Sequence, residues 1–422
     1  MRKHKMKRNK AVVVAAIFGL VSVVALHASG SSDRPVKEPA WVKSIPAEKI
    51  IEWRRHIHQN PELSYEELFT SEYVSSVLES FGNIEVIWPT PTSVVGILRG
   101  GKAGSTVAFR ADMDALPVPE ETGLPFASVN EGVSHACGHD VHTAMLLGTA
   151  ATLSSMQKQI KGTVYFIFQH AEEQSPGGAL DIIQTGVLDE VKAFFGLHIG
   201  PGPVPGAVGI LPDGPASTAS DGFYLIIQGR GSHGSMPHLG IDPIVAGAEI
   251  VTALQTIVSR NVAPGEMAVI SVGKFQSGNA PNVIPDRALL AGTVRTITEP
   301  TRHLLEERIR TVINNITLAH GATCSLEYSS GYPAMQNDPA LNRLARASAI
   351  KILGSAMVMD APRMTASEDF ARYSKIAPSC YISLSTGPGV TNHHPAFNPD
   401  ESALIYGVKA EVQIILDYLD QK

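Results

Sequence analysis

The sequence predicts an α/β protein in which a mainly parallel sheet is flanked by helices and a smaller α+β domain is inserted. Two observations support this prediction. Apolar, strand-like segments at 93–98, 106–110, 163–169, 193–199 and 380–385 alternate with helix-like ones, which is typical of a parallel sheet covered on both faces. Between 217 and 329 the order becomes strand, helix, two strands, helix and strand, the split arrangement of ferredoxin-like domains.

The first residues indicate an export leader. A basic stretch from Arg2 to Lys10 precedes an apolar run at 11–26 and the small residues Ala28, Ser29 and Gly30. This pattern is typical of a signal peptide, expected at 1–28. The run is just short of the ~20 residues that a membrane-spanning helix prefers. We therefore expect a periplasmic or secreted protein, attached to a membrane only if the leader is retained.

The body of the chain divides into three expected parts after a linker at 29–46. The first part, 47–216, is helical at 47–80 apart from an interruption at Pro61 and Glu62, and helical again at 143–156. The inserted domain, 217–329, has helices expected at 243–259 and 301–320. The last part, 330–422, returns to the first pattern with helices at 339–353 and 401–419.

Composition and charge exclude several classes of protein. Of 422 residues, 44% are hydrophobic and 18% charged, which is typical of chains with buried cores. Beyond the first ten residues, 28 basic residues face 40 acidic ones, a net charge of −12. An acidic body of this kind argues against a nucleic-acid partner.

The densest cluster of metal-type side chains lies directly before the helix expected at 143–156. It contains His135, Cys137, His139, Asp140 and His142 within eight residues. Thiolate and imidazole are the preferred ligands of zinc and related metals. A lone histidine would more often be structural, but this density predicts a metal site.

Further candidate ligands follow the strands of the same predicted sheet. Glu172 and Glu173 come directly after an apolar strand, where a loop allows both to serve one site. Burying two like charges is costly unless a cation neutralises one, so one glutamate is expected to bind metal while the other acts as a general base. Another strand carries His198, and a late loop carries His393 and His394. Five ligands exceed what one tetrahedral ion accepts, which favours two metals.

These residues stand in a familiar order. The chain resembles the amidohydrolase branch of the di-metal aminoacylase and carboxypeptidase superfamily, which includes hippurate hydrolases, N-acetyl-amino-acid deacetylases and auxin-conjugate hydrolases. The resemblance runs from about residue 48 to the C-terminus. It rests on Arg54-Arg55-His56-Ile-His58, Pro61-Glu62, Arg110-Ala-Asp112-Met-Asp114, the cluster from His135 to His142, Gln169-His-Ala-Glu172-Glu173, Gly196-Leu-His198, Gly234-Ser-Met-Pro237-His238, Asn282-Val-Ile-Pro285 and Glu368-Asp369-Phe370.

The resemblance implies a role for each matching residue. Two divalent ions, zinc, manganese, cobalt or nickel, would be held by Cys137, His139, Glu173, His198 and His393, with His394 the alternative to His393. Glu172 would take a proton from the attacking water and return it to the leaving amine, and Asp114 would hold the site in shape. The inserted domain would be a lid and dimerisation domain. Its His233 would reach the partner subunit's site to stabilise the oxyanion, and Asn282 would help to bind the substrate carboxylate.

The sequence therefore predicts an exported amidohydrolase that cleaves the amide of an N-acyl amino acid or a related small conjugate. A metallo-carboxypeptidase or dipeptidase is the alternative within the same chemistry. A non-catalytic metal- or amino-acid-binding protein is the alternative of another class, although the base Glu172 is present. The glycines Gly229, Gly231 and Gly234 formally match a dinucleotide fingerprint, but Pro237 and Pro243 follow too soon for the required helix.

Overall fold

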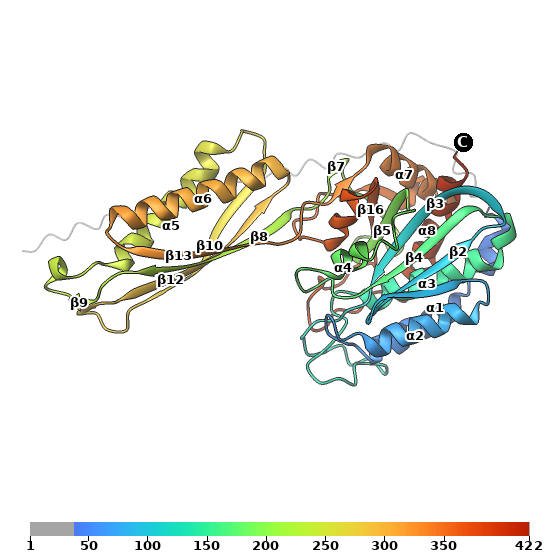
Figure 1. The fold of residues 1–422 in the computed structure, drawn as a ribbon. Helices are drawn as coiled ribbons and strands as arrows, with labels where there is room; N and C mark the ends of the chain where they lie inside the picture. The colour runs from blue at the N-terminus through green and yellow to red at the C-terminus, as the bar shows by residue number, and fades with distance from the viewer. Residues whose placement is uncertain (1–37, 422) are drawn as a thin grey trace, which may run out of the picture. The chain divides into compact units, whose positions relative to one another are not determined.

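The computed structural model describes residues 38–421, so the expected signal peptide and the first half of the linker lie outside the described residues. Its larger sheet has eight strands in the order β1-β2-β4-β3-β5-β16-β6-β15. Figure 1 labels β2, β3, β4, β5 and β16 of this sheet. These strands are β1 (Glu85–Thr90), β2 (Ser93–Arg99), β3 (Lys102–Asp112), β4 (Lys161–Gln169), β5 (Ala193–Gly200), β6 (Val208–Ile210), β15 (Val358–Asp360) and β16 (Ser379–Ser385). The central strands β4, β3, β5 and β16 run parallel, which confirms the expected fold class.

Successive residues of the central strands feed two hydrophobic cores, one on each face of this sheet. In β4, Phe166 and Phe168 belong to one core, whereas Tyr165 and Ile167 belong to the other. This alternation follows from the two-residue repeat of a strand. Helices from both ends of the chain complete the first core: α1 (Ala47–Gln59), α2 (Leu68–Ser80), α3 (His139–Ser155), α7 (Pro339–Leu353) and α8 (Leu404–Leu419). The short helix α4 (Gly178–Gln184) contributes to the second core.

Helix α3 begins four residues earlier than the sequence predicted. It starts at His139 rather than at residue 143, so part of the metal-type cluster lies in its first turn. Gly138 precedes it with a φ of 94°, a left-handed conformation that favours glycine. A Cβ at this position would also lie 2.4 Å from Ile199 Cδ1. The glycine therefore ends the loop and starts the helix against the end of β5.

Residues 219–330 form a second sheet with a core of its own. The four strands have the order β10-β12-β8-β13, and every pairing is antiparallel. Helices α5 (Pro243–Asn261) and α6 (Glu299–Ala319) cover one face of this sheet (Figure 1). The strands are β8 (Ala219–Gln228), β10 (Ala268–Ser277), β12 (Arg287–Thr296) and β13 (Thr323–Ser330). Their order along the chain is the one the sequence predicted.

Two small antiparallel pairs complete the described part of the chain. Strands β7 (Gly214–Pro215) and β14 (Gln336–Asn337) pair just outside the second sheet. Strands β9 (Ser232–His233) and β11 (Val283–Ile284) pair at its loops. A 3-10 turn at Pro237–Leu239 follows the glycines, and α5 begins only at Pro243, which excludes the dinucleotide-binding arrangement. Within residues 38–421, no helix is both long enough and apolar enough to span a bilayer.

Candidate active site

The expected metal ligands come from one edge of the larger sheet. Glu173 follows the end of β4, and His198 lies near the end of β5. His393 lies in the loop after β16, while Cys137 and His139 lie at the start of α3. Because parallel strands present their carboxyl ends at the same edge, the topology gathers these residues into one site.

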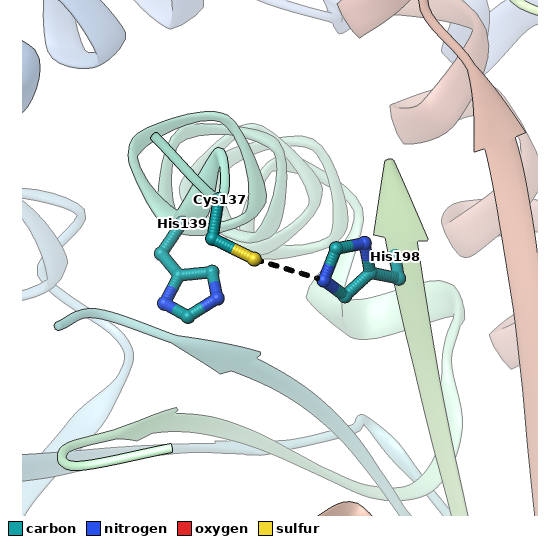
Figure 2. A group of neighbouring side chains, drawn as sticks. All are labelled: Cys137, His139 and His198. Carbon is teal, nitrogen blue, oxygen red and sulfur yellow. Dashed lines mark hydrogen bonds between the residues drawn. The ribbon is translucent and has the colours of Figure 1, made fainter. Parts of the chain in front are cut away.

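The five side chains form two groups that share one thiol. The ligand atoms of Cys137, His139 and His198 all lie within 4.8 Å of one another, and so do those of Cys137, Glu173 and His393. Cys137 Sγ lies 3.4 Å from His198 Nε2 (Figure 2). His393 Nε2 lies 3.2 Å from Glu173 Oε1. A donor common to both groups is what a pair of ions with a bridging ligand requires.

Asp114 fixes the orientation of the His139 ring. His139 Nδ1 lies 2.8 Å from the Asp114 carbonyl oxygen and 3.1 Å from its carboxylate Oδ1. Burial favours the neutral acid, but the bond and charge of His139, together with the bonds from the Glu173 N–H and the Ser64 hydroxyl, lower the pKa of Asp114, so both oxygens accept. The ring proton therefore lies on Nδ1. Nε2 is buried without a hydrogen-bond partner among the described residues, as expected of an atom that would bind a metal.

His142 belongs to the predicted cluster, but hydrogen bonds occupy both of its ring nitrogens. Its Nε2 accepts the Ile199 N–H at 2.9 Å, and its Nδ1 donates to Asp112 Oδ1 at 2.6 Å. A backbone N–H can only donate, which settles the tautomer. His198 in turn donates from Nδ1 to the Ile199 carbonyl at 2.7 Å, leaving Nε2 toward Cys137. His142 therefore supports the end of β5 instead of offering a free nitrogen.

Asp140 is likewise engaged away from the ligand groups. Its Oδ2 accepts from Arg54 Nε and lies 2.8 Å from His58 Nδ1. All three side chains are buried. This network anchors the first turn of α3 to α1, and it explains the Arg54 and His58 of the sequence motif in structural terms.

The adjacent glutamates reach the same site because the chain turns sharply before them. Ala171 has a φ of 50°, a region that residues other than glycine rarely occupy. The Ala171 N–H donates to Glu67 Oε1 at 2.7 Å, and the Glu173 N–H donates to Asp114 Oδ2 at 2.9 Å. The ligand atoms of Glu172, Glu173 and His139 lie within 4.8 Å of one another. Sequence reasoning did not single out Glu67, whose donor, the Ala171 N–H, lies about a hundred residues away along the chain.

The electrostatics of the site favour a cation. Burial raises the pKa of Glu172 well above its ordinary value, and Glu368 and Glu173 raise it further. Burial also raises the pKa of the Cys137 thiol, and Glu173 adds to this effect. A divalent ion would reverse both trends because it stabilises carboxylate and thiolate directly. The donor set of one thiol, three imidazoles and a carboxylate suits zinc and neighbouring transition metals.

Four of the five expected ligands line a cavity of about 360 Å³: Cys137, Glu173, His198 and His393. This volume is in the range of small-molecule sites. Tyr332 is fixed in the wall because its hydroxyl donates to the Glu172 carbonyl at 2.7 Å, and Glu368 is fixed by the Tyr381 hydroxyl at 2.8 Å. The remaining wall is small, apolar or uncharged, and is formed by Ile199, Gly200, Met364, Ala366, Ser367, Ser383 and Asn392. These residues are dispersed along the chain, and no sequence pattern pointed to them as a group.

The two neighbouring histidines of the late loop take different positions. His393 faces Glu173 and belongs to the second ligand group. His394 Nδ1 instead accepts the Ala396 N–H at 3.0 Å, within its own loop. Of the two alternatives, the structure places His393 in the site.

His233 and Asn282 lie together, on the second sheet's loops. The Gly234 N–H donates to the Asn282 carbonyl at 2.8 Å, and His233 pairs with Val283 across β9 and β11. Both predicted residues are exposed. Neither lines the cavity beside Cys137. The structure thus brings the five expected ligands, Glu172 and Asp114 into one site and places His233 and Asn282 in another group.

An α/β sheet whose strand ends gather thiol, imidazole and carboxylate donors defines a metallohydrolase-type site. Residues 108–417 match the family model described as peptidase family M20/M25/M40, and the chain belongs to this family.

Three relatives illustrate the likeness. An N-acetyl-L-cysteine deacetylase of Bacillus subtilis is 42% identical over 359 residues, 85% of each chain. An N-acyl-L-amino acid amidohydrolase of Geobacillus stearothermophilus is 48% identical over 288 residues, covering 68% of this chain and 78% of the relative. A Bacillus subtilis structure, described as a dinuclear metal binding peptidase from the M20 family, has a TM-score of 0.78 at 35% identity and covers 89% of this chain and 99% of its own.

Proposed function

We propose that this protein is a metal-dependent amidohydrolase that cleaves the amide bond of N-acyl amino acids or related small conjugates. The observation that carries the proposal is the pair of ligand groups sharing Cys137, with Glu172 beside them at the wall of a small cavity. The names of the two deacetylase and amidohydrolase relatives support the substrate class.

Five residues would hold two divalent ions: Cys137, His139, Glu173, His198 and His393. Zinc, manganese, cobalt and nickel all suit this mixture of thiolate, imidazole and carboxylate donors. When bound, the ions would polarise the scissile carbonyl and lower the pKa of water. Asp114 keeps His139 in the required tautomer, a role typical of outer-shell carboxylates.

Glu172 moves the proton. It takes a proton from water as the oxygen adds to the acyl carbon, and it delivers that proton to the nitrogen as the C–N bond breaks. The products are a carboxylic acid and a free amine. Burial and neighbouring carboxylates raise the pKa of Glu172 while bound ions would lower it, and these opposing effects suit a carboxyl group that must accept a proton and then release it.

The active unit is a homodimer joined through the second sheet's domain, with His233 and Asn282 serving the partner's site. The Ser235 N–H donates to His233 Nδ1 at 3.1 Å, so the ring proton lies on Nε2, which can then donate to an oxyanion. Exposed apolar side chains surround this loop, a feature typical of interaction surfaces: Met236, Leu239, Ile244, Val245 and Val283.

We also propose that the protein is exported. The basic stretch, apolar run and small residues at 1–30 support a cleaved signal peptide and a periplasmic or secreted location. N-terminal sequencing of the mature protein would test the cleavage expected near Ala28.

A substrate panel tests the proposed function. N-acetyl, N-benzoyl and indole-acetyl amino acids, together with simple dipeptides, would be assayed with and without a chelator. We expect chelator-sensitive release of a free amine from at least one N-acyl amino acid. Preference for dipeptides would favour the carboxypeptidase or dipeptidase alternative. Bound metal with no hydrolysis of any member would favour a binding protein.

A further inference from the structure

Asn392 lies between three segments that carry expected ligands. It precedes His393 in the loop after β16 and lines the cavity. Its side-chain Nδ2 donates to the Cys137 carbonyl at 2.8 Å and to the Ile199 carbonyl at 3.3 Å. Because both neighbours are carbonyl oxygens, which only accept, the amide nitrogen must face them.

Each of these carbonyls belongs to a different ligand segment. Cys137 is itself an expected ligand at the start of α3. Ile199 directly follows His198, and its carbonyl also accepts from His198 Nδ1 at 2.7 Å. One amide therefore joins the α3 segment, the end of β5 and the late loop. It also donates to the Ile199 carbonyl, the same acceptor that sets the His198 tautomer.

The late loop needs such an anchor because its backbone is strained. His393 has a φ of 68°, a left-handed conformation that is unfavourable for a residue with a Cβ. Its N–H donates to the Ala136 carbonyl at 2.7 Å, again on the α3 segment. The side chain of the adjacent Asn392 adds its two hydrogen bonds to this one. Together the three bonds hold His393 toward Glu173.

We propose that Asn392 is the positioning residue that orders the two ligand groups, by bridging the Cys137 and Ile199 carbonyls while it holds His393. This role rests on the proposed metal-dependent function. An amide suits the place because its nitrogen carries two N–H groups on a short side chain. Serine offers one donor, and aspartate would set an oxygen against two carbonyls.

Metal affinity is the property that this role controls. Without the bridge, the α3 segment, His198 and His393 would each need to be ordered by the metal itself, so part of the binding free energy would be spent on ordering. Loss of an outer-shell contact typically lowers metal affinity about 10- to 100-fold. A purely structural contact would lower stability without selectively weakening metal binding.

Competition with a chromophoric chelator tests the proposal on metal-free full-length protein, with zinc or manganese alone as the probe. Asn392→Ala should bind metal about 10- to 100-fold more weakly than wild type, and Asn392→Asp should bind no better than the alanine variant. Saturating metal should restore most of the turnover of Asn392→Ala, because the substitution leaves Glu172 in place.

Asn342→Ala is the matched control. Asn342 lies on α7, away from the ligands, and its Nδ2 also donates to two acceptors, the Leu211 carbonyl at 2.9 Å and Asp213 Oδ1 at 2.7 Å. This variant should lose thermal stability but keep wild-type metal affinity. Wild-type affinity in Asn392→Ala would overturn the proposal and leave the function intact. A wild-type protein that binds no metal would overturn the proposed function itself.

Discussion

Two histidine-bearing loops of this chain, one that runs into the first turn of α3 and one that carries His233, are held in opposite ways. The segment from His135 to His142 is buried throughout, and its side chains bond to α1, β3 and β5. The loop that carries His233 is exposed, and the His233 ring accepts only from Ser235, two residues away. The first loop is organised entirely within the chain. In the second loop, His233 Nε2 can donate a hydrogen bond, but no described residue accepts it.

This difference between the two loops matches two different tasks, metal binding and transition-state stabilisation. Metal ligands must stand in a fixed geometry before the ion arrives, which requires buried supporting bonds. A donor for the transition state needs only to be in place when the substrate is bound, and it can be supplied by another subunit. The following predictions test each half of this division.

The largest effect is expected at Glu172. Glu172→Gln removes the proton carrier but not a ligand, so kcat should fall by about 10² to 10⁴ while metal content stays at the wild-type level. Steady-state kinetics combined with metal analysis would check this. Near-normal turnover in a metal-loaded variant would show that another group moves the proton.

The next effect concerns the exposed loop. His233→Ala should lower kcat by about 10² to 10³, the usual result of losing one oxyanion donor, and should leave metal affinity unchanged. His303→Ala is a matched control because it removes another exposed histidine from the same domain. Equal activity of the two variants would remove His233 from the chemistry.

A smaller effect is expected from the cysteines. Cys137→Ser should weaken metal binding by at least the about 10- to 100-fold typical of losing an outer-shell contact, because Cys137 belongs to both ligand groups. Cys380→Ser removes another buried thiol, one that lies within β16 and its core. Metal analysis after dialysis would compare them, and equal metal content would contradict the site as described.

Much of this architecture could be predicted from the sequence, because the apolar strands and the ligands at their ends are local patterns. Glu173 comes just after a predicted strand and His198 lies near the end of another, and parallel order brings such strand ends together. The supporting bonds were not predictable in this way. In the sequence, His142 cannot be told apart from the metal ligands of the same cluster. Only its hydrogen bond with the Ile199 N–H, 57 residues away, shows that it supports the end of β5. Asn392 and Glu67 act through backbone groups, which leave no pattern in the sequence.

The smallest effect is expected at a buried contact between helices α3 and α8. Glu411 on α8 is buried and accepts from the Thr149 hydroxyl on α3 at 2.6 Å. Burial raises the pKa of Glu411 from 4.5 to about 8, although the Thr149 bond opposes this. The folded protein therefore holds a proton that the unfolded chain releases, and stability should fall as pH rises from 4.5 through about 8.

Glu411→Gln should flatten that dependence. Its slope in the free energy of unfolding should be smaller than that of wild type by up to about 1.4 kcal/mol per pH unit in this window. Thermal or denaturant unfolding between pH 5 and pH 9 would measure both proteins. Parallel curves for the two would mean that Glu411 is ionised in the folded state.

Subunit mixing tests the division between the two loops most directly. Glu172→Gln and His233→Ala are each expected to be nearly inactive alone. In a mixed dimer, the site on the His233→Ala chain has its own Glu172 and receives His233 from its partner, so one intact site forms. Equimolar exchange should restore roughly a quarter of wild-type activity. No recovery, under conditions where labelled subunits are shown to exchange, would contradict a site completed by the neighbouring subunit.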